Sequence, residues 1–197
     1  MKNLKNCGLT IFDIDETLFH TKANVQVCKD GKITCVLDNQ KYNSYKLKKG
    51  ESFDYTQFKS AKFFKDTSTP ITKVIKRAKQ IIHFAAQKGS KVIIVTARQD
   101  LDDKRLFKET FKAQGIDIKK VYVERAGNIG KETASENKVE VFKRYLDTNR
   151  YVRIRLFDDD LNNLKSFLSL KSEYPQVSFK GYQVLNSGNM IQIQTDY

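Results

Sequence analysis

Short apolar runs of strand length recur along this sequence, and polar residues follow three of them directly. These runs are GLTIFDI at 8–14, KVIIV at 91–95 and VRIRLF at 152–157, and they lead into Asp13 and Asp15, Thr96, and Asp158 to Asp160. Weaker strand patterns occupy 121–123 and 177–185. Apolar runs of this kind are typical of strands that are buried on both faces of a sheet.

Amphipathic helix patterns lie between these runs. Apolar residues recur at helical spacing from Pro70 to Ala85, with Thr69 as the expected N-cap and Pro70 as the first helical residue. Further helices are expected at 101–114, from the T-x-x-E capping box at Thr133 to Leu146, and along the stripe Leu161, Leu164 and Leu168. This alternation predicts an α/β fold, a Rossmann-like parallel sheet with helices on both faces and ligands at the carboxyl ends of its strands.

One segment, from about residue 19 to 68, breaks the alternation. Asp30-Gly31 separates two β-prone runs, which is a strong β-hairpin signal. We therefore expect a single domain over residues 1–197 with a small hairpin-containing cap inserted at about 19–68. Its aromatic residues have two interpretations, a surface that stacks bases among lysines or the cap's own small core. They are Tyr42, Tyr45, Phe53 and Tyr55, and the neighbouring lysines are Lys46, Lys48 and Lys49.

The formal net charge of +13 favours a phosphate-rich or nucleic-acid partner, although a basic surface can also serve solubility alone. Apolar runs stay well below the roughly 20 residues that span a membrane, and the start, MKNLKNCG, lacks the apolar core of a secretion signal. Three cysteines, Cys7, Cys28 and Cys35, are expected to be free buried thiols in a reducing compartment. We therefore expect a cytoplasmic protein without a membrane partner.

The sequence FDIDETLF places two carboxylates, Asp13 and Asp15, at the end of a strand. Residues two apart on an extended strand point the same way, and two close carboxylates repel unless a cation or proton lies between them. Mg²⁺ is the natural occupant because it prefers oxygen ligands. Asp13 can attack phosphorus as a nucleophile, and Asp15 is placed to exchange protons as the acid/base. Two turn aspartates without chemistry are the alternative.

Other strand ends offer further candidates. Thr96 can hold a phosphoryl oxygen, although an ordinary helix cap fits the same pattern. Arg98 can contact substrate phosphate, although it can also be a solvated arginine. In LFDDDLNNL, Asp159 is the preferred metal ligand beside Asp158, Asn163 can assist, and Asp160 is expected to cap the next helix. Lys138, with Lys131 as its rival, can balance the phosphoryl charge. These roles are expected from the positions of the residues in the sequence alone.

A possible nucleotide-binding loop, GNIGKET, is excluded. The P-loop pattern requires glycine where Arg125 stands and Ser or Thr where Glu132 stands. No nucleotide-kinase module is therefore expected.

The four pieces FDIDETLF, VTAR, SENKVEVFKRYL and LFDDDLNNL, in this order, resemble the haloacid dehalogenase (HAD) superfamily of phosphohydrolases. The resemblance implies a nucleophile at Asp13, an acid/base at Asp15, and a motif threonine at Thr17, which we expect among the substrate-binding residues. It also implies catalytic roles for Thr96 and Lys138, and Mg²⁺ held by Asp13, the main-chain carbonyl of Asp15, and Asp159 of the acidic pair Asp158–Asp159.

Closer resemblances differ in what they imply. DIDET resembles phosphatases that act on phosphoserine tails, whereas KVEVFKRYL, RLFDDD and YQVLNSG resemble the 3′-phosphatase domain of phage polynucleotide kinases. The whole chain is similar to phosphatase-like proteins of tailed phages, which implies the host cytoplasm. We expect a Mg²⁺-dependent phosphatase acting on a phosphorylated small molecule, a nucleotide or a nucleic-acid end. The alternatives are a phosphoprotein phosphatase and an inactive nucleic-acid-binding module.

Overall fold

A six-stranded sheet forms the centre of the molecule. The computed structural model describes residues 7–87 and 89–194, so most of the basic start of the chain lies outside the described residues. The strand order is β11-β10-β9-β1-β7-β8. The strands are β1 (Gly8–Phe12), β7 (Lys91–Thr96), β8 (Tyr122–Arg125), β9 (Arg153–Asp158), β10 (Ser178–Val184) and β11 (Met190–Ile193). Neighbouring strands are parallel except for β10 and β11, which confirms the expected α/β sheet.

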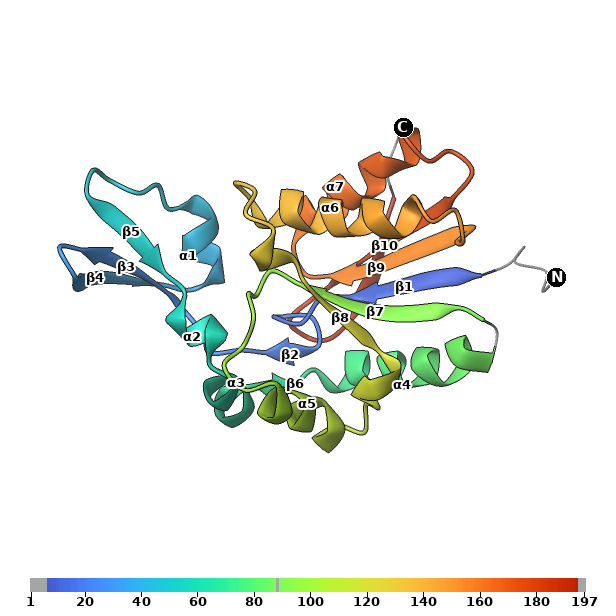
Figure 1. The fold of residues 1–197 in the computed structure, drawn as a ribbon, viewed down its shortest axis with the longest axis horizontal. Coiled ribbons are helices and arrows are strands. Elements are labelled where there is room, and N and C mark those ends of the chain that lie inside the picture. The colour runs from blue at the N-terminus through green and yellow to red at the C-terminus, as the bar shows by residue number, and fades with distance from the viewer. Residues whose placement is uncertain (1–6, 88, 195–197) are drawn as a thin grey trace.

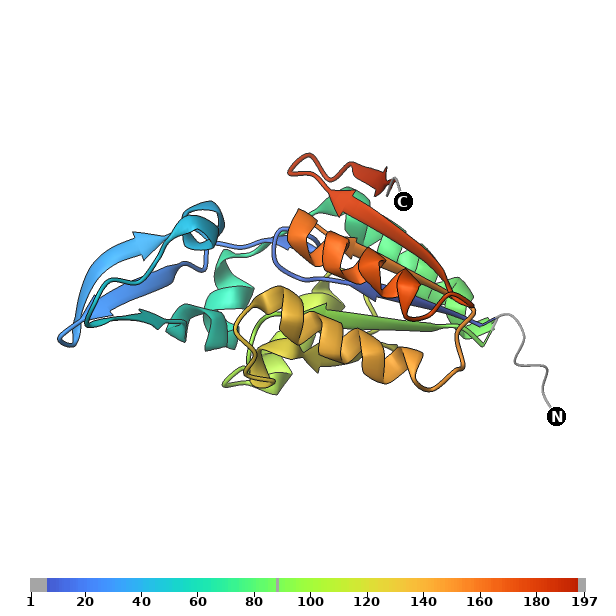
Figure 2. The ribbon, with the colours of Figure 1, turned by 90° about the horizontal axis from the view of Figure 1, so that it is seen from above.

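Helices cover both faces of this sheet (Figures 1 and 2). One face carries α4 (Thr72–Gln87) and α5 (Lys104–Ala113), and the other carries α6 (Ala134–Leu146) and α7 (Leu161–Ser169). Three 3-10 turns, η1 (Ile118–Lys120), η2 (Ala126–Asn128) and η3 (Leu170–Ser172), join the larger elements. Within the described ranges, none of the helices combines the length and apolarity that crossing a membrane requires.

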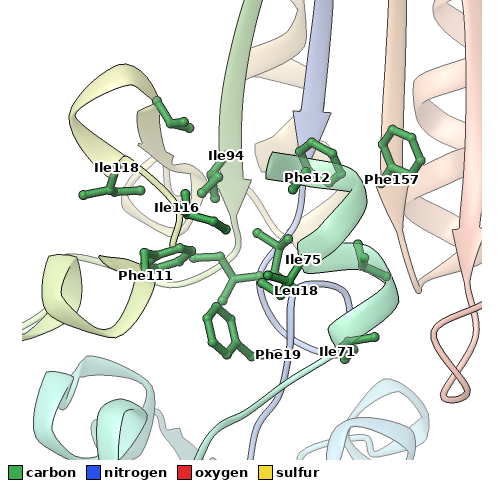
Figure 3. Close-up of a cluster of buried hydrophobic side chains, with 14 of the residues drawn as sticks. Phe12, Leu18, Phe19, Ile71, Ile75, Ile94, Phe111, Ile116, Ile118 and Phe157 are labelled. Atoms are coloured by element: carbon green, nitrogen blue, oxygen red, sulfur yellow. The ribbon is translucent and has the colours of Figure 1, made fainter. Parts of the chain in front are cut away.

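The core forms two layers because successive residues of β1 point to opposite faces of the sheet. Leu9 and Ile11 pack in the layer under α6 and α7, while Phe12 packs in the layer under α4 and α5. Figure 3 shows Phe12 in this second layer, near Ile75 of α4. Each fully buried side chain of this kind contributes about 1.5–3 kcal/mol, so the strand that leads into Asp13 is firmly anchored.

We call residues 19–68, which lie between β1 and α4, the cap segment. Its sheet and first helix stand apart at the left of Figure 1, whereas its last helix packs beside α5, and Ala61 and Phe64 lie in the core under α4 and α5. The sheet of the cap segment has the order β4-β3-β5, and the segment also contains three short helices. The elements are β3 (Val25–Lys29), β4 (Lys32–Leu37), α1 (Asn39–Ser44), β5 (Glu51–Asp54), α2 (Thr56–Lys59) and α3 (Ala61–Thr67). Asp30 and Gly31 both have positive φ, as the tight turn of the expected hairpin requires.

A short pairing closes the base of the cap segment. Strand β2 (Phe19–His20) pairs antiparallel with β6 (Thr69–Pro70). Thr69 and Pro70 therefore belong to a strand, so the expectation that Thr69 caps α4 is wrong, and the helix begins at Thr72. The helix expected at 101–114 likewise begins later, at Lys104, because the side chain of Asp103 accepts hydrogen bonds from the first amides of α5.

The three cysteines are free, as expected, but each is partly exposed rather than buried.

Candidate active site

Three carboxylates meet where β1 and β9 end side by side. Phe12 pairs with Phe157 in the sheet, and the amide of Asp13 donates to the carbonyl oxygen of Phe157 at 3.0 Å. Asp158 ends β9 and Asp159 follows it. Carboxylate oxygens of Asp13, Asp158 and Asp159 lie within 4.8 Å of one another. The parallel pairing of two strands thus brings together residues about 145 positions apart.

Lys138, in the second turn of α6, reaches into this cluster. Its Nζ atom lies 2.9 Å from Oδ1 of Asp13 and 2.8 Å from Oδ2 of Asp158, and its side chain is 2 % exposed. The T-x-x-E capping box at Thr133 is present and fixes where α6 begins. The rival candidate, Lys131, has a side chain that is 53 % exposed and lies 4.0 Å from Glu140. The structure therefore places Lys138, and not Lys131, against Asp13.

The two aspartates at the end of β9 have different hydrogen-bond partners. Asp158 is fully buried and accepts from the amide of Asp160 and the side-chain amide of Asn163, both at 3.0 Å. Asp159 accepts from the hydroxyl of Thr17 at 3.2 Å. Asp160 caps α7, as expected. Thr17, which the resemblance placed near substrate, is fully buried and contacts a carboxylate instead.

The cluster carries more negative than positive charge. Three carboxylates and one ammonium sum to −2. Burial raises the pKa of Asp13 well above its usual value, and the other aspartates add to this against the opposing effect of Lys138. Burial and Asp158 raise the pKa of Asp159 to about 7. Burial lowers the pKa of Lys138, but Asp13 and Asp158 more than offset this, so it lies above its usual value.

The donor set fits a divalent cation. Asp13, Asp159 and Asn163 line an open cleft. The buried side-chain oxygen of Asn163 has no hydrogen-bond partner among the described residues. Carboxylate and carboxamide oxygens are the ligands that hard cations take, and a positive charge relieves the repulsion between the aspartates. The acidic cluster is therefore compatible with metal binding.

Asp15 pairs with Arg98 rather than with the cluster. Nε of Arg98 donates to both carboxylate oxygens of Asp15, at 2.9 and 3.2 Å, and Nη2 lies 2.6 Å from one of them. Nη1 donates to the carbonyl oxygen of Phe58 in the cap segment at 2.9 Å, and the guanidinium lies over the rings of Phe58 and Phe64. Arg98 is 3 % exposed, so the alternative of a solvated arginine is wrong.

The reason for this arrangement is the end of β1 at Phe12, which leaves Asp13 and Asp15 outside a regular strand. Glu16 has a positive φ, and the amides of Leu18 and Phe19 both donate to the carbonyl oxygen of Ile14. This tight turn directs the Asp15 carboxylate to Arg98. The side-by-side pair of carboxylates expected from strand alternation is therefore replaced by Asp13 with Asp158 and Asp159, and the carboxylate of Asp15 lies outside this cluster.

A cleft of about 360 Å³ opens over these residues. Asp13, Asp15, Lys138 and Asp159 contribute to one side, and the cap segment contributes to another. Thr96 is fully buried at the end of β7, its hydroxyl oxygen accepts from the amide of Arg98 at 3.1 Å, and the next residues line the cleft. The arrangement provides a candidate nucleophile in the carboxylate of Asp13 and a second carboxylate, Asp15, held by a guanidinium. The ammonium of Lys138 lies between Asp13 and Asp158.

A family model of the HAD superfamily, subfamily IIIB (acid phosphatase), matches residues 34–180, about three quarters of the chain. The chain belongs to the HAD superfamily. This HAD protein is a phosphatase, a phosphoric monoester hydrolase, and its substrate is a phosphorylated compound. The matched segment includes Thr96, Lys138, Asp158 and Asp159 and begins after Asp13 and Asp15. No curated protein matches the sequence.

The aromatic residues of the phosphatase's cap segment form its own small core. Tyr42, Tyr45, Phe53 and Tyr55 pack against buried Val25, Val27 and Leu37. Of these aromatics, Tyr42 and Tyr55 also line the cleft, and their hydroxyls are hydrogen-bonded to each other at 2.9 Å. Tyr42 and Tyr55 therefore belong to the small core of the cap segment and also face the cleft.

Sequence reasoning missed one wall of the cleft, the segment from Gly127 to the first turn of α6. Gly130, Lys131 and Thr133 of GNIGKET, which the sequence analysis set aside, line the cleft. The amide of Lys131 donates to the side-chain oxygen of Asn137 at 2.9 Å and fixes the loop. Two glycines ahead of a capping box were the available signal for a tight loop at a helix start.

Gly127 is needed where this loop meets the loop after β7. A Cβ at Gly127 would collide with the carbonyl oxygen of Ala97 and the backbone of Arg98. Gly127→Ala is expected to lower the melting temperature by about 5 °C and kcat/KM on p-nitrophenyl phosphate several-fold, because the two loops must separate. Gly31→Ala is the control for kcat/KM. Its Cβ meets nothing within 4 Å, but its φ of +73° strains an alanine, so it should also lower the melting temperature while leaving kcat/KM unchanged. Equal effects of both changes on kcat/KM would contradict this role.

Proposed function

We propose that this phosphatase is Mg²⁺-dependent, forms an aspartyl-phosphate on Asp13, and acts on a nucleotide or a nucleic-acid end. The observation that carries the proposal is the contact of Asp13 with Lys138 beside Asp158 and Asp159, on the floor of a cleft. Asp13 and Asp159 would hold the cation, with Asp158 beside them and the main-chain carbonyl of Asp15 as the family resemblance implies. When bound, Mg²⁺ supplies positive charge that offsets the phosphoryl oxygens.

In the first half of the proposed reaction, a carboxylate oxygen of Asp13 attacks phosphorus and the ester P–O bond breaks. Asp15, which enters this step carrying a proton, gives it to the departing oxygen, so the leaving group departs as an alcohol and Asp15 is left as the carboxylate. Arg98 orients Asp15 for this step through its paired N–H groups. Lys138 balances the charge of Asp13 and of the transferred phosphoryl group.

In the second half, Asp15 takes a proton from water. The water oxygen bonds to phosphorus, the bond between phosphorus and Asp13 breaks, and phosphate leaves. Both aspartates then return to their starting states, so one water is consumed for each ester cleaved.

The substrate class rests on charge and on the cap. The net charge of +13 attracts polyanions, and Lys59 and Lys131 line the cleft together with Tyr42 and Tyr55. A phosphate carried by an aromatic base matches such a wall better than a phosphate alone. We further propose that residues 19–68 act as the cap of one domain, and that the protein, with its three free thiols, works in the cytoplasm.

A substrate panel tests this proposal. The protein is expected to release phosphate from p-nitrophenyl phosphate, and from an oligonucleotide phosphorylated at its 3′ or 5′ end, in MgCl₂ and not in EDTA. Oligonucleotide turnover should exceed phosphopeptide turnover. Folded protein that hydrolyses none of the compounds would exclude the proposal, and preferential phosphopeptide turnover would replace it with a phosphoprotein phosphatase. Salt-sensitive oligonucleotide binding without turnover would indicate the inactive binding module.

A further inference from the structure

A second hollow, of about 790 Å³, is lined by residues of β8, which is an edge strand of the main sheet. We call it the β8 groove. It is strongly basic, with two carboxylates, Asp100 and Glu124, against five cations: Lys104, Lys108, Lys119, Arg125 and Arg144. Glu124 is engaged by Arg144 at 3.4 Å and by the hydroxyl of Tyr145 at 2.8 Å. The groove therefore keeps an excess of positive charge.

Arg125 is the half-buried cation of this groove. Its side chain is 13 % exposed, and its guanidinium lies 4.4 Å from the ring centre of Phe107. Among the residues that the structure describes, its Nε and Nη1 atoms have no hydrogen-bond partner. The nearest carboxylate oxygen, of Asp100, is 3.9 Å from Nε, beyond hydrogen-bond distance. Burial lowers the pKa of Arg125; Asp100 opposes this and Arg98 adds to it. A guanidinium with two unpaired N–H groups can bind an anion.

The three lysines of the groove are also available to a ligand. Lys104, Lys108 and Lys119 are exposed, and within the described part of the chain no carboxylate forms an ion pair with them. Tyr122, 59 % exposed, adds an aromatic face to the same groove. Exposed rings among cations are typical of surfaces that bind single-stranded nucleic acid.

The groove begins where the catalytic cleft ends. Arg125 pairs with Thr96 in the sheet, so one strand spacing, about 4.8 Å, separates their backbones. The side-chain amide of Gln99 donates to the carbonyl oxygen of Gly127 at 3.4 Å, and both residues line the cleft. The amide of Asp100 donates to the side chain of Asn128 at 3.3 Å, and both line the groove. Adjoining residues of the same two loops therefore line the two hollows.

We infer that the β8 groove binds internal phosphodiester groups of an oligonucleotide whose terminal phosphate lies at Asp13. This inference rests on the proposed function and names its substrate as a polymer rather than a mononucleotide. A substrate longer than one nucleotide can contact both hollows at once. Arginine presents paired donors that match phosphate oxygens, and the lysines add attraction that depends on salt.

The test compares a ten-nucleotide thymidine oligomer, phosphorylated at the end that the enzyme hydrolyses, with the matching mononucleotide and p-nitrophenyl phosphate. Arg125→Gln is expected to lower kcat/KM on the oligomer roughly tenfold or more, the effect of losing a charged hydrogen bond. The values for the two small substrates should stay within about twofold. Arg105→Gln, which removes an exposed cation paired with Glu109 outside the groove, should change none of the three.

A second variant keeps the test valid should Arg125→Gln fail to fold. The exposed pair Lys104→Gln/Lys108→Gln should reduce the slope of log kcat/KM against log salt on the oligomer by about 1.4. Losses shared equally by the oligomer and p-nitrophenyl phosphate, or no loss in any folded groove variant, would overturn the inference. So would inhibition by inorganic phosphate that disappears in Arg125→Gln while oligomer kinetics stay unchanged, because the ligand would then be a free anion.

Binding separates failure of the groove from failure of the proposed function. A labelled, unphosphorylated thymidine oligomer should bind the full-length protein in a fluorescence anisotropy titration, and the groove variants should weaken that binding. If the protein hydrolyses nothing but the groove variants still weaken binding, the catalytic proposal fails and the groove stands. If p-nitrophenyl phosphate is hydrolysed but the groove variants bind the oligomer as tightly as the unmodified protein, the groove inference fails alone.

Discussion

Replacing Asp13 by asparagine is expected to lower kcat on p-nitrophenyl phosphate at least ~1,000-fold while the protein stays folded. Asparagine keeps the shape of the side chain and can still accept a hydrogen bond from Lys138, but its amide cannot attack phosphorus. Stability should not fall, because burial and the neighbouring aspartates already disfavour a charge at this position. Phosphate release and thermal melting of the same preparation check both statements.

The control for this change is Asp103→Asn. Asp103 caps α5, where asparagine serves equally well, and it lies outside the carboxylate cluster. It should leave both kcat and the melting temperature unchanged. Activity retained in Asp13→Asn would remove Asp13 from the role of nucleophile, while loss of folding would show that the carboxylate is needed for structure.

Lys138→Met should reduce both activity and stability. Without the ammonium, buried Asp13 and Asp158 face each other uncompensated, and breaking a buried pair in this way costs about 3–5 kcal/mol. For a chain of this size we expect the melting temperature to fall by roughly 10 °C. Because Lys138 lowers the pKa of Asp13, its removal raises that pKa further and leaves less of the attacking carboxylate. We expect kcat to fall at least ~100-fold.

Lys143→Met is the matched control on the same helix. Lys143 forms a surface ion pair with Glu173 at 2.7 Å, and such pairs contribute at most about 1 kcal/mol. Its replacement should leave kcat unchanged and lower the melting temperature by only a few degrees. A Lys138→Met protein as stable and active as the Lys143→Met protein would refute the importance of the buried ammonium.

Much of the main domain was predictable because its signals are local. The apolar runs before Asp13, Thr96 and Asp158 became β1, β7 and β9, and the capping box at Thr133 marked the start of α6. The Asp30-Gly31 turn was equally clear. Position at the ends of parallel strands was sufficient to nominate the residues that form the carboxylate cluster.

The missed features depend on partners that are distant along the chain. Thr69 and Pro70 fit a helix start locally, but pairing with Phe19 and His20 makes them a strand. Asp15 is separated from Arg98 by 83 positions, and only the folded turn after β1 brings them together. The edge strand β11 and the groove beside β8 likewise follow from packing. The sequence alone nominates Arg98 as a phosphate contact and not as the partner of Asp15, and it ranks Arg125 with the many other surface cations.

The antiparallel pairing of Phe19–His20 with Thr69–Pro70 has a consequence for how this phosphatase can diversify. The two ends of the cap segment leave the domain side by side, so the part that stands apart, from β3 to β5, can be exchanged without shifting the register of the main sheet. The helix α3 must stay, because Ala61 and Phe64 lie in the main core. Chimeras that carry another lid between these two short strands would show whether substrate choice can change while the carboxylate cluster stays the same. Any graft must still supply the carbonyl oxygen that Phe58 now offers to Arg98.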